Sequence, residues 1–155
     1  MPVPDFILKL REKVGHDRLW LPGVTAVVVR GDELLMVQRS DNHQWTPVTG
    51  IVDPGEEPAV AARREALEET GVEISVDRLA MTSVSGEYHY ANGDHAIYLD
   101  VTFACSWVAG EPYVADDESV DVRWWPLDGL PASDPWMAER IEAALSGEVA
   151  ARFRA

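Results

Sequence analysis

The feature that most constrains the fold of this chain is an acidic 23-residue segment, GIVDPGEEPAVAARREALEETGV. Alanine and leucine, which are good helix formers, dominate its middle, and Pro58 suits the first turn of a helix. A glycine near its end suits a helix stop. In a helix, Glu65, Glu68 and Glu69 have i, i+3 and i+4 spacing and project from one face. The segment therefore predicts a helix with an acidic face.

Clustered glutamates on one helical face repel each other, and no lysine or arginine is expected to share that face. A bound cation explains such a cluster best, and hard oxygen ligands favour Mg²⁺ or Mn²⁺. An ordinary solvated acidic face is the alternative. With about 100° of rotation per residue, Val60 and Leu67 fall opposite the carboxylates, as do Ala59 and Ala66. We therefore expect the apolar face to be buried and the acidic face to be open.

The same segment resembles the Nudix box, G-x5-E-x7-R-E-U-x-E-E-x-G-U, in which U is an apolar residue. The fixed positions are Gly50, Glu56, Arg64, Glu65, Glu68, Glu69 and Gly71. Ala66 and Val72 take the two apolar places. The chain is thus similar to the Nudix hydrolase family, which includes MutT-like and ADP-ribose pyrophosphatase-like proteins. The resemblance covers roughly residues 20–145, although only the box is specific.

The resemblance assigns roles to the residues of the box. It implies that Glu68 and Glu69 are metal ligands, and that Glu65 is a further ligand or the base that takes a proton from water. The backbone carbonyl of Gly50 often completes the metal shell in this family. Glu56 is expected to contribute a ligand or to brace the loop before the helix.

Two more residues are expected to assist this site. Arg64 lies one turn before Glu68 and can hold that carboxylate in place, the alternative being a surface ion pair. Family members often carry an acidic residue in the loop before a late strand, as a ligand or general base. Among the adjacent Asp116, Asp117 and Glu118, the position favours Glu118, against a simple polar loop.

The approach to the box departs from the usual W-x-x-P-G-G pattern of the family. Thr49 replaces the glycine that commonly precedes the box glycine. That glycine gives the backbone freedom beside the metal, so the change concerns the local backbone conformation. The acidic cluster itself is intact.

The implied reaction is metal-dependent hydrolysis of the pyrophosphate bond in a nucleoside diphosphate derivative. Divalent metal would neutralise phosphate charge and lower the pKa of bound water. The substrate is left open between a nucleotide sugar such as ADP-ribose and a nucleoside triphosphate. The alternative is a non-catalytic Nudix-fold module that binds and senses a nucleotide. The complete glutamate set favours the hydrolase, because a sensor does not need it.

Three residues outside the box are candidates for substrate binding. Tyr88 and Tyr90 can stack on a base, and they lie near the place where a tyrosine marks diadenosine polyphosphate hydrolases in the family. Ordinary strand or turn aromatics are the alternative. Arg39, just after a predicted strand, can meet a substrate phosphate, although a lone arginine is more often a surface residue.

Length and composition indicate one domain over residues 1–155, with a core at about 20–145. The single cysteine, Cys105, lies in an apolar run and is expected to be a core thiol in a reducing compartment. The net charge of −14 argues against a nucleic acid polymer as partner and leaves a small nucleotide open. We expect no membrane span, a cytoplasmic location and, through apolar N-terminal residues, a homodimer.

Periodicity and turn signals place the remaining elements. Helices are expected over residues 4–14, capped by Asp5, and over residues 135–145, capped by Asp134. Strands are expected over residues 24–29, 34–38, 45–52, 72–85, 95–108 and 120–125. A break is expected at residues 21–23, and Trp124 and Trp125 would point to opposite faces. This mixture suggests an α/β/α sandwich with a mixed β-sheet, which is also the Nudix fold.

Overall fold

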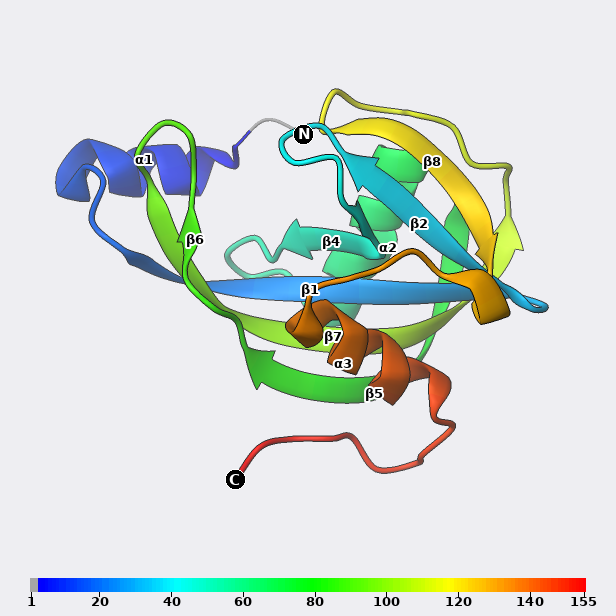
Figure 1. Ribbon diagram of the computed structural model, residues 1–155. Coiled ribbons are helices and arrows are strands. Elements are labelled where there is room, and N and C mark those ends of the chain that lie inside the picture. Colours follow the sequence, from blue (N-terminus) through cyan, green and yellow to red (C-terminus); the bar gives the residue numbers. More distant parts are fainter. Residues whose placement is uncertain (1–2) are drawn as a thin grey trace.

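A mixed β-sheet with helices on both faces forms the framework of the protein (Figure 1). The computed structural model describes residues 3–155. Its helices are α1 (Asp5–Val14), α2 (Pro58–Thr70) and α3 (Pro135–Leu145), with a 3-10 turn, η1 (Leu127–Gly129). Its strands are β1 (Leu19–Arg30), β2 (Glu33–Arg39), β3 (Trp45–Thr46), β4 (Val48–Ile51), β5 (Glu73–Val84), β6 (Tyr88–His89), β7 (His95–Ala109) and β8 (Ser119–Pro126).

The long strand β1 organises the sheet. Within the described residues, eight strands form one sheet whose main path is β3-β2-β1-β7-β5. β7 runs parallel to β1 along one edge, and the other pairs are antiparallel. The second edge of β1 is shared, because β4 pairs with residues 23–26 and β2 pairs with Val29 and Arg30. β2 and β4 therefore diverge from the same edge of β1.

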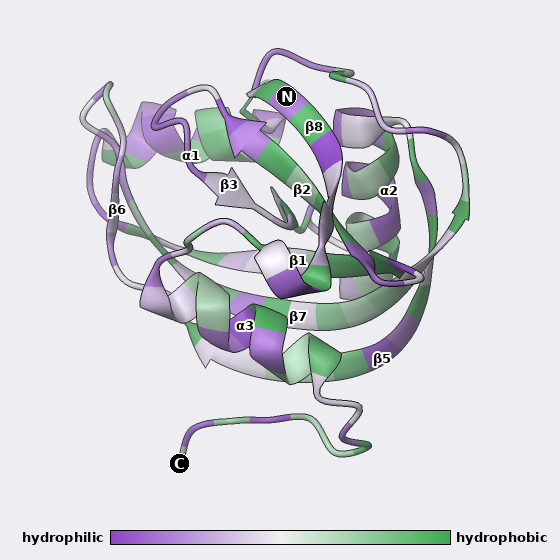
Figure 2. Cartoon of the chain, turned by 45° about the vertical axis from the view of Figure 1, so that its right-hand side comes forward, coloured by the Kyte–Doolittle hydropathy of each residue, from purple (hydrophilic) through white to green (hydrophobic). Residues whose placement is uncertain are grey.

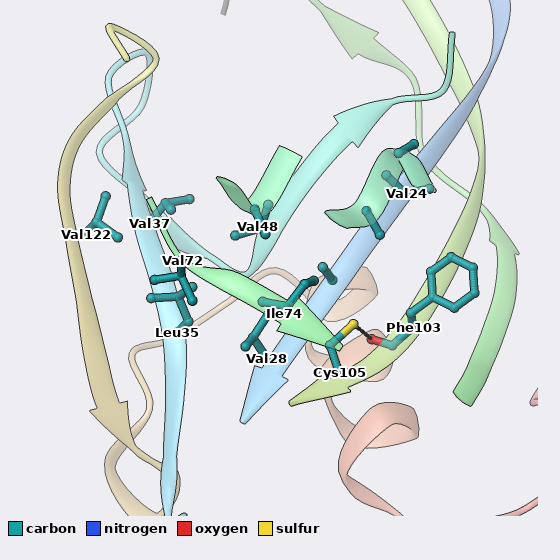
Figure 3. Packing of buried hydrophobic residues seen from close by; sticks show 14 of the residues in the cluster. Val24, Val28, Leu35, Val37, Val48, Val72, Ile74, Phe103, Cys105 and Val122 are labelled. Carbon is teal, nitrogen blue, oxygen red and sulfur yellow. Dashed lines mark hydrogen bonds between the residues drawn. The ribbon is translucent and has the colours of Figure 1, made fainter. Parts of the chain in front are cut away.

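Alternation along the strands produces a separate hydrophobic cluster on each face of the sheet. Val24 and Val28 of β1 belong to the cluster beneath α2, which Figure 3 shows from close by. Val27, between them, packs in the cluster beneath α3. Figure 2 shows that α3 carries both hydrophobic and hydrophilic segments, as expected of a helix with one buried side. Trp124 and Trp125 join opposite clusters, as predicted.

This arrangement confirms the predicted α/β/α sandwich with a mixed β-sheet. The two predicted helices and the strands over residues 24–29, 34–38, 72–85, 95–108 and 120–125 are present, with ends shifted by a few residues. Cys105 is buried in the cluster beneath α2, and burial raises the pKa of its thiol to about 12, as suits a core thiol. None of the described helices combines the length and apolar character that crossing a membrane requires.

Two strand limits differ from the sequence-based expectation. The break predicted at residues 21–23 is wrong, because β1 runs through them. The parallel pairing with β7 continues across Pro22, whose missing N–H removes one donor from the ladder. The single strand predicted over residues 45–52 is divided at Pro47 into β3 and β4. These two short strands pair with β2 and β1, respectively, because the chain changes partner at the proline.

The helix ends confirm one predicted cap and correct another. The side chain of Asp134 accepts a hydrogen bond from the N–H of Met137 at 2.9 Å, so it caps α3 as predicted. The predicted cap at Asp5 is wrong. Pro4 holds the N-cap position of α1, and Asp5 lies in the first turn without a side-chain capping bond within residues 3–155. At the end of α2, Gly71 adopts a left-handed conformation with φ of 71°.

Candidate functional site

Helix α2 packs against the sheet through alanines. Ala61, Ala62 and Ala66 are fully buried against β1, β4 and β5, and their small side chains allow the helix to approach the sheet closely. Two glutamates lie on this same packed side, since Glu65 is 0% and Glu69 4% exposed. The helix thus carries carboxylates into the space between itself and the sheet.

The expected orientation of α2 is therefore wrong for its two large apolar side chains, whereas Ala66, expected on the same face, is buried as predicted. Val60 and Leu67, predicted to be buried, are 53% and 51% exposed, whereas two members of the acidic face are buried. The physical reason is steric, because branched side chains between helix and sheet would hold the helix away from β4. The alanines take that place and leave room for the longer glutamates beside them.

The side chain of Glu65 fills the place that a Cβ atom would take at Gly50, across the interface between α2 and β4. A Cβ atom at position 50 would lie 2.2 Å from Cγ and 2.4 Å from Oε1 of Glu65, so a larger residue would displace the carboxylate. Oε1 of Glu65 accepts a hydrogen bond from Arg64 at 2.8 Å. Its other oxygen, Oε2, is buried without a hydrogen-bond partner in the described part of the chain. A buried oxygen of this kind suits a ligand to a cation.

Arg64 connects the glutamates of the box to one another. It binds both oxygens of Glu56, at 2.8 and 2.9 Å, and also donates to Oε1 of Glu65 and, at 3.2 Å, to Oε2 of Glu68. The expectation that no arginine shares the acidic face is wrong. Its predicted contact with Glu68 is present, but the paired bonds to Glu56 are shorter. These bonds to Glu56 and the charge of Glu65 raise the pKa of Arg64.

Glu56 is braced from two directions. Besides its two bonds from Arg64, its Oε2 accepts a hydrogen bond from the N–H of Asp53 at 3.1 Å. The bonds from Arg64 and Asp53 lower the pKa of Glu56, against a smaller effect of burial. Of the two roles expected for Glu56, this engagement favours bracing of the loop before α2 over metal ligation.

A second acidic segment meets α2 from the loop before β8. One oxygen each from Glu69, Asp116 and Glu118 lie within 4.8 Å of one another. The loop is anchored to the end of α2, because the N–H of Tyr113 donates to the carbonyl of Thr70 at 3.0 Å. Glu118, predicted from its position in the sequence, is thus placed beside the box, and Asp116 accompanies it.

Burial and mutual repulsion favour the protonated form of the buried carboxyls. Burial raises the pKa of Glu65 to about 7, with Arg64 opposing the rise. Burial raises the pKa of Glu69 to about 9, and the charges of Glu65, Glu118 and Asp116 add to the rise. A cation placed among these groups would restore their charged forms. The all-oxygen donor set and the unpartnered Oε2 of Glu65 therefore fit a hard divalent ion such as Mg²⁺ or Mn²⁺.

A pocket of about 420 Å³ opens beside the acidic cluster, where β2 and β4 separate. Six residues that line the pocket were also candidates from the sequence: Arg39, Gly50, Glu69, Tyr88, Tyr90 and Glu118. The pocket thus brings the predicted substrate residues into the same space as part of the predicted metal site. Glu56, Arg64, Glu65 and Glu68 are not among the residues that line it.

Three tyrosines also line the pocket. The rings of Tyr88 and Tyr90 stack with centroids 6.4 Å apart, and Tyr98 meets Tyr88 edge-on at 5.4 Å. The hydroxyls of Tyr90 and Tyr98 are hydrogen-bonded at 2.5 Å. Arg39 lines the same pocket, and its guanidinium donates two hydrogen bonds of 2.9 and 2.7 Å to Asp41.

Several residues of the pocket were not predicted from the sequence. Tyr98 and Asp41 gave no signal of their own, because a tyrosine in a strand and an aspartate in a turn are common. Asp100 and Arg140 were also missed, although both are buried and line the pocket. Asp100 was detectable as a charged residue within the long apolar run that forms β7. Burial raises its pKa, and the guanidinium of Arg140, 3.4 Å away, opposes that rise.

Thr49, which departs from the family pattern, forms regular strand structure. It pairs with Thr25 in the antiparallel ladder between β4 and β1. Its φ is not positive, since His43 is the residue with positive φ among the described residues other than glycine. This position therefore does not need the wider backbone freedom of glycine. Thr49 lines the pocket beside Gly50.

Comparison with known proteins agrees with this geometry. The NUDIX domain family matches residues 20–144, and the chain therefore belongs to that family. It is 34% identical over 138 residues to the CMP-5'-(N-acetyl-N-hydroxy-3-aminopropyl)phosphonate hydrolase of Streptomyces rubellomurinus, covering 81% of this chain and 62% of that protein. It is 31% identical over 116 residues to the NAD-capped RNA hydrolase NudC of Stutzerimonas stutzeri, covering 72% and 38%, respectively. The chain thus spans less than two thirds of either relative.

A solved structure shows the same architecture. The MutT NUDIX hydrolase of Burkholderia pseudomallei superimposes with a TM-score of 0.62 and 26% sequence identity. The superposition covers 81% of this chain and 98% of that one. This likeness supports the predicted Nudix fold over most of the chain.

Proposed function

We propose that this chain is a divalent-metal-dependent hydrolase that cleaves the pyrophosphate bond of a nucleoside diphosphate derivative. One observation carries the proposal: carboxylates from α2 and from the loop before β8 converge beside a pocket that is also lined by stacked tyrosines. Such a pocket can hold the phosphate and the base of one nucleotide at the same time. Two relatives named as hydrolases of a CMP derivative and of NAD-capped RNA support a nucleotide substrate.

The acidic cluster would hold the ion. Glu65 through Oε2, and Glu69, are the buried ligands we propose, with Glu68 and the Gly50 carbonyl as further ligands implied by the family resemblance. A bound Mg²⁺ or Mn²⁺ would neutralise phosphate charge and make a coordinated water more acidic. Arg64 supports this set without entering the pocket, because it fixes the orientation of Glu65 and Glu68.

The remaining residues would position the substrate and move a proton. Tyr88 and Tyr90 would stack on the base, and Arg39 would lie near a phosphate. Water attacks one phosphorus of the anhydride, a new P–O bond forms, and the bridging P–O bond breaks to release the second phosphate as an anion. Glu118 lines the pocket, whereas Glu65 is not among its lining residues, and this difference supports Glu118 as the group that accepts the proton.

A substrate panel tests the proposal directly. The chain is incubated with Mg²⁺ and ADP-ribose, NADH, diadenosine polyphosphates, or ordinary and oxidised nucleoside triphosphates. We expect hydrolysis of at least one compound, loss of turnover in EDTA, and recovery when Mg²⁺ is restored. Nucleotide binding, measured by tyrosine fluorescence, without cleavage of any compound would instead support the sensor alternative.

A further inference from the structure

A second group of metal-ligating side chains lies on the hairpin formed by β6 and β7. His89 and His95 are directly opposite each other in the antiparallel ladder, and Glu87 immediately precedes β6. One ligand atom from each of the three residues lies within 4.8 Å of the others. The group is separate from the acidic cluster on α2, because it contains none of those residues.

The distances are close to those of a metal site. Nδ1 of His95 lies 3.4 Å from Oε1 of Glu87, and Nε2 of His89 lies 3.9 Å from its Oε2. Metal–ligand bonds of about 2.0–2.2 Å in tetrahedral geometry place ligand atoms about 3.3 Å apart. The imidazoles are already close, with ring centroids 4.3 Å apart at 68°. Both side chains are partly exposed, so small rotations can bring the three atoms together.

The ligand types select the ion. Two imidazole nitrogens with one carboxylate suit Zn²⁺ and related transition metals, whereas Mg²⁺ prefers oxygen ligands alone. Two arginines are the nearby cations. Arg18 is 4.0 Å from Glu87, with a side chain 59% exposed, and Arg11 donates to the backbone carbonyl of His95. Neither contact occupies an imidazole nitrogen, so the histidines keep their ligand atoms.

We propose that Glu87, His89 and His95 bind one divalent transition-metal ion of the zinc type. Three protein ligands leave one position of a tetrahedral ion for water. The cross-strand position of the histidines means that the ion would clamp β6 to β7. This site is independent of the proposed hydrolase activity, since its ligands and its preferred ion differ from those of the acidic cluster.

The chain offers an internal control for this proposal, because it has four histidines. Zn²⁺ is added to the protein in excess Mg²⁺ at pH 7.5, and the imidazole signals are followed by NMR. We expect the signals of His89 and His95 to change and saturate at one equivalent. The signals of His16 and His43, which lie outside the group, stay unchanged. Absence of any change at His89 and His95 would overturn the proposal.

Variants then identify the ligands. We expect His89→Asn, His95→Asn and Glu87→Gln each to weaken Zn²⁺ binding by about tenfold or more. His43→Asn and Glu69→Gln are expected to bind Zn²⁺ as the unaltered chain does, the second because its carboxylate belongs to the other cluster. Unchanged binding in any of the three ligand variants, or loss in either control, would contradict the assignment. Circular dichroism of each variant verifies that it is folded.

Discussion

Gly50 has a steric role that follows from the position of Glu65. The glycine lies in β4 without a side chain, and the carboxylate of Glu65 fills the place of the missing Cβ. Its backbone carbonyl was the contribution expected from the family resemblance. The structure adds a second reason for glycine, because only a residue without Cβ admits the buried carboxylate beside the sheet.

Substitution of this residue gives a sharp prediction. In Gly50→Ala, the new methyl group would displace Glu65 and is expected to lower turnover by about 100-fold and stability by about 1–3 kcal/mol. Steady-state kinetics and urea denaturation measure the two effects. Gly129→Ala is the matched control, since a Cβ there meets only Pro126, at 3.4 Å. Equal effects at the two glycines would contradict the steric argument.

Substitution of Glu68 tests the role of its charge in turnover without disturbing the packing of the core. Its side chain is 46% exposed and Arg64 contacts one of its oxygens. Glu68→Gln keeps the shape and removes the charge, so we expect turnover to fall by about 100-fold or more with unchanged thermal stability. Glu57→Gln, on an exposed glutamate outside the cluster, is expected to retain activity. Undiminished turnover in Glu68→Gln would refute the ligand role.

At the scale of elements, the sequence predicted that α2 exists but not which of its sides meets the sheet. Hydrophobicity alone ranks Val60 and Leu67 above alanine as core residues. The side that meets the sheet is instead the one with small side chains, because the alanines permit a short distance between helix and sheet. The buried glutamates need the space beside them. The pairing partners of β3 and β4 were equally beyond prediction, since periodicity gives a strand and not its neighbour.

The helix caps supply a second element-scale prediction. Asp134→Ala removes the bond to the N–H of Met137 and is expected to cost about 1 kcal/mol of stability, within a range of about 0.5–2 kcal/mol. Asp5→Ala removes an aspartate of similar sequence context that makes no capping bond, so a change of at most about 0.5 kcal/mol is expected. Chemical denaturation measures the free energy of unfolding of both variants and so distinguishes the two expected losses. A larger effect at Asp5 would contradict the structural assignment.

At the scale of the whole molecule, the buried carboxyls link stability to pH. In the folded chain the pKa of Glu65 is about 7 and that of Glu69 about 9, both above the ordinary 4.5. Between these values and 4.5 the folded state holds more protons than the unfolded state, so stability falls as pH rises through this window. Without divalent metal, we expect a lower melting temperature at pH 9 than at pH 6.

The contribution of the buried carboxyls to this pH dependence can be tested with one variant and with Mg²⁺. Glu69→Gln cannot ionise, so the fall in melting temperature between pH 6 and pH 9 is expected to be smaller than in the unaltered chain. Mg²⁺ is expected to raise the melting temperature more at pH 9 than at pH 6, because it binds the ionised carboxylates. Scanning calorimetry with and without EDTA measures both. An identical pH slope in Glu69→Gln would show that other groups cause the change.

The sequence predicted the layers of the molecule and the residues of the box more fully than the pocket. Seven box positions and their spacing sufficed for the family, and the mixture of helices and strands sufficed for the sandwich. The pocket depends on contacts between segments that are distant in the sequence, such as Asp100 with Arg140, which no local pattern encodes. The predicted homodimer stays a prediction. Leu8 and Leu10 on α1 are exposed, and they are among the apolar N-terminal residues on which that prediction rests.

The separate pairing of β4 with β1 and of β6 with β7 has a mechanical consequence. Within the described residues, β4 and β6 do not hydrogen-bond to each other directly and are joined only through β1 and β7. A nucleotide that contacts both the carboxylates and the tyrosines would connect β4 with β6 and restrict the motion of both. Its occupancy is expected to slow amide hydrogen exchange in both segments at once, while exchange in β5, whose residues do not line the pocket, is little changed.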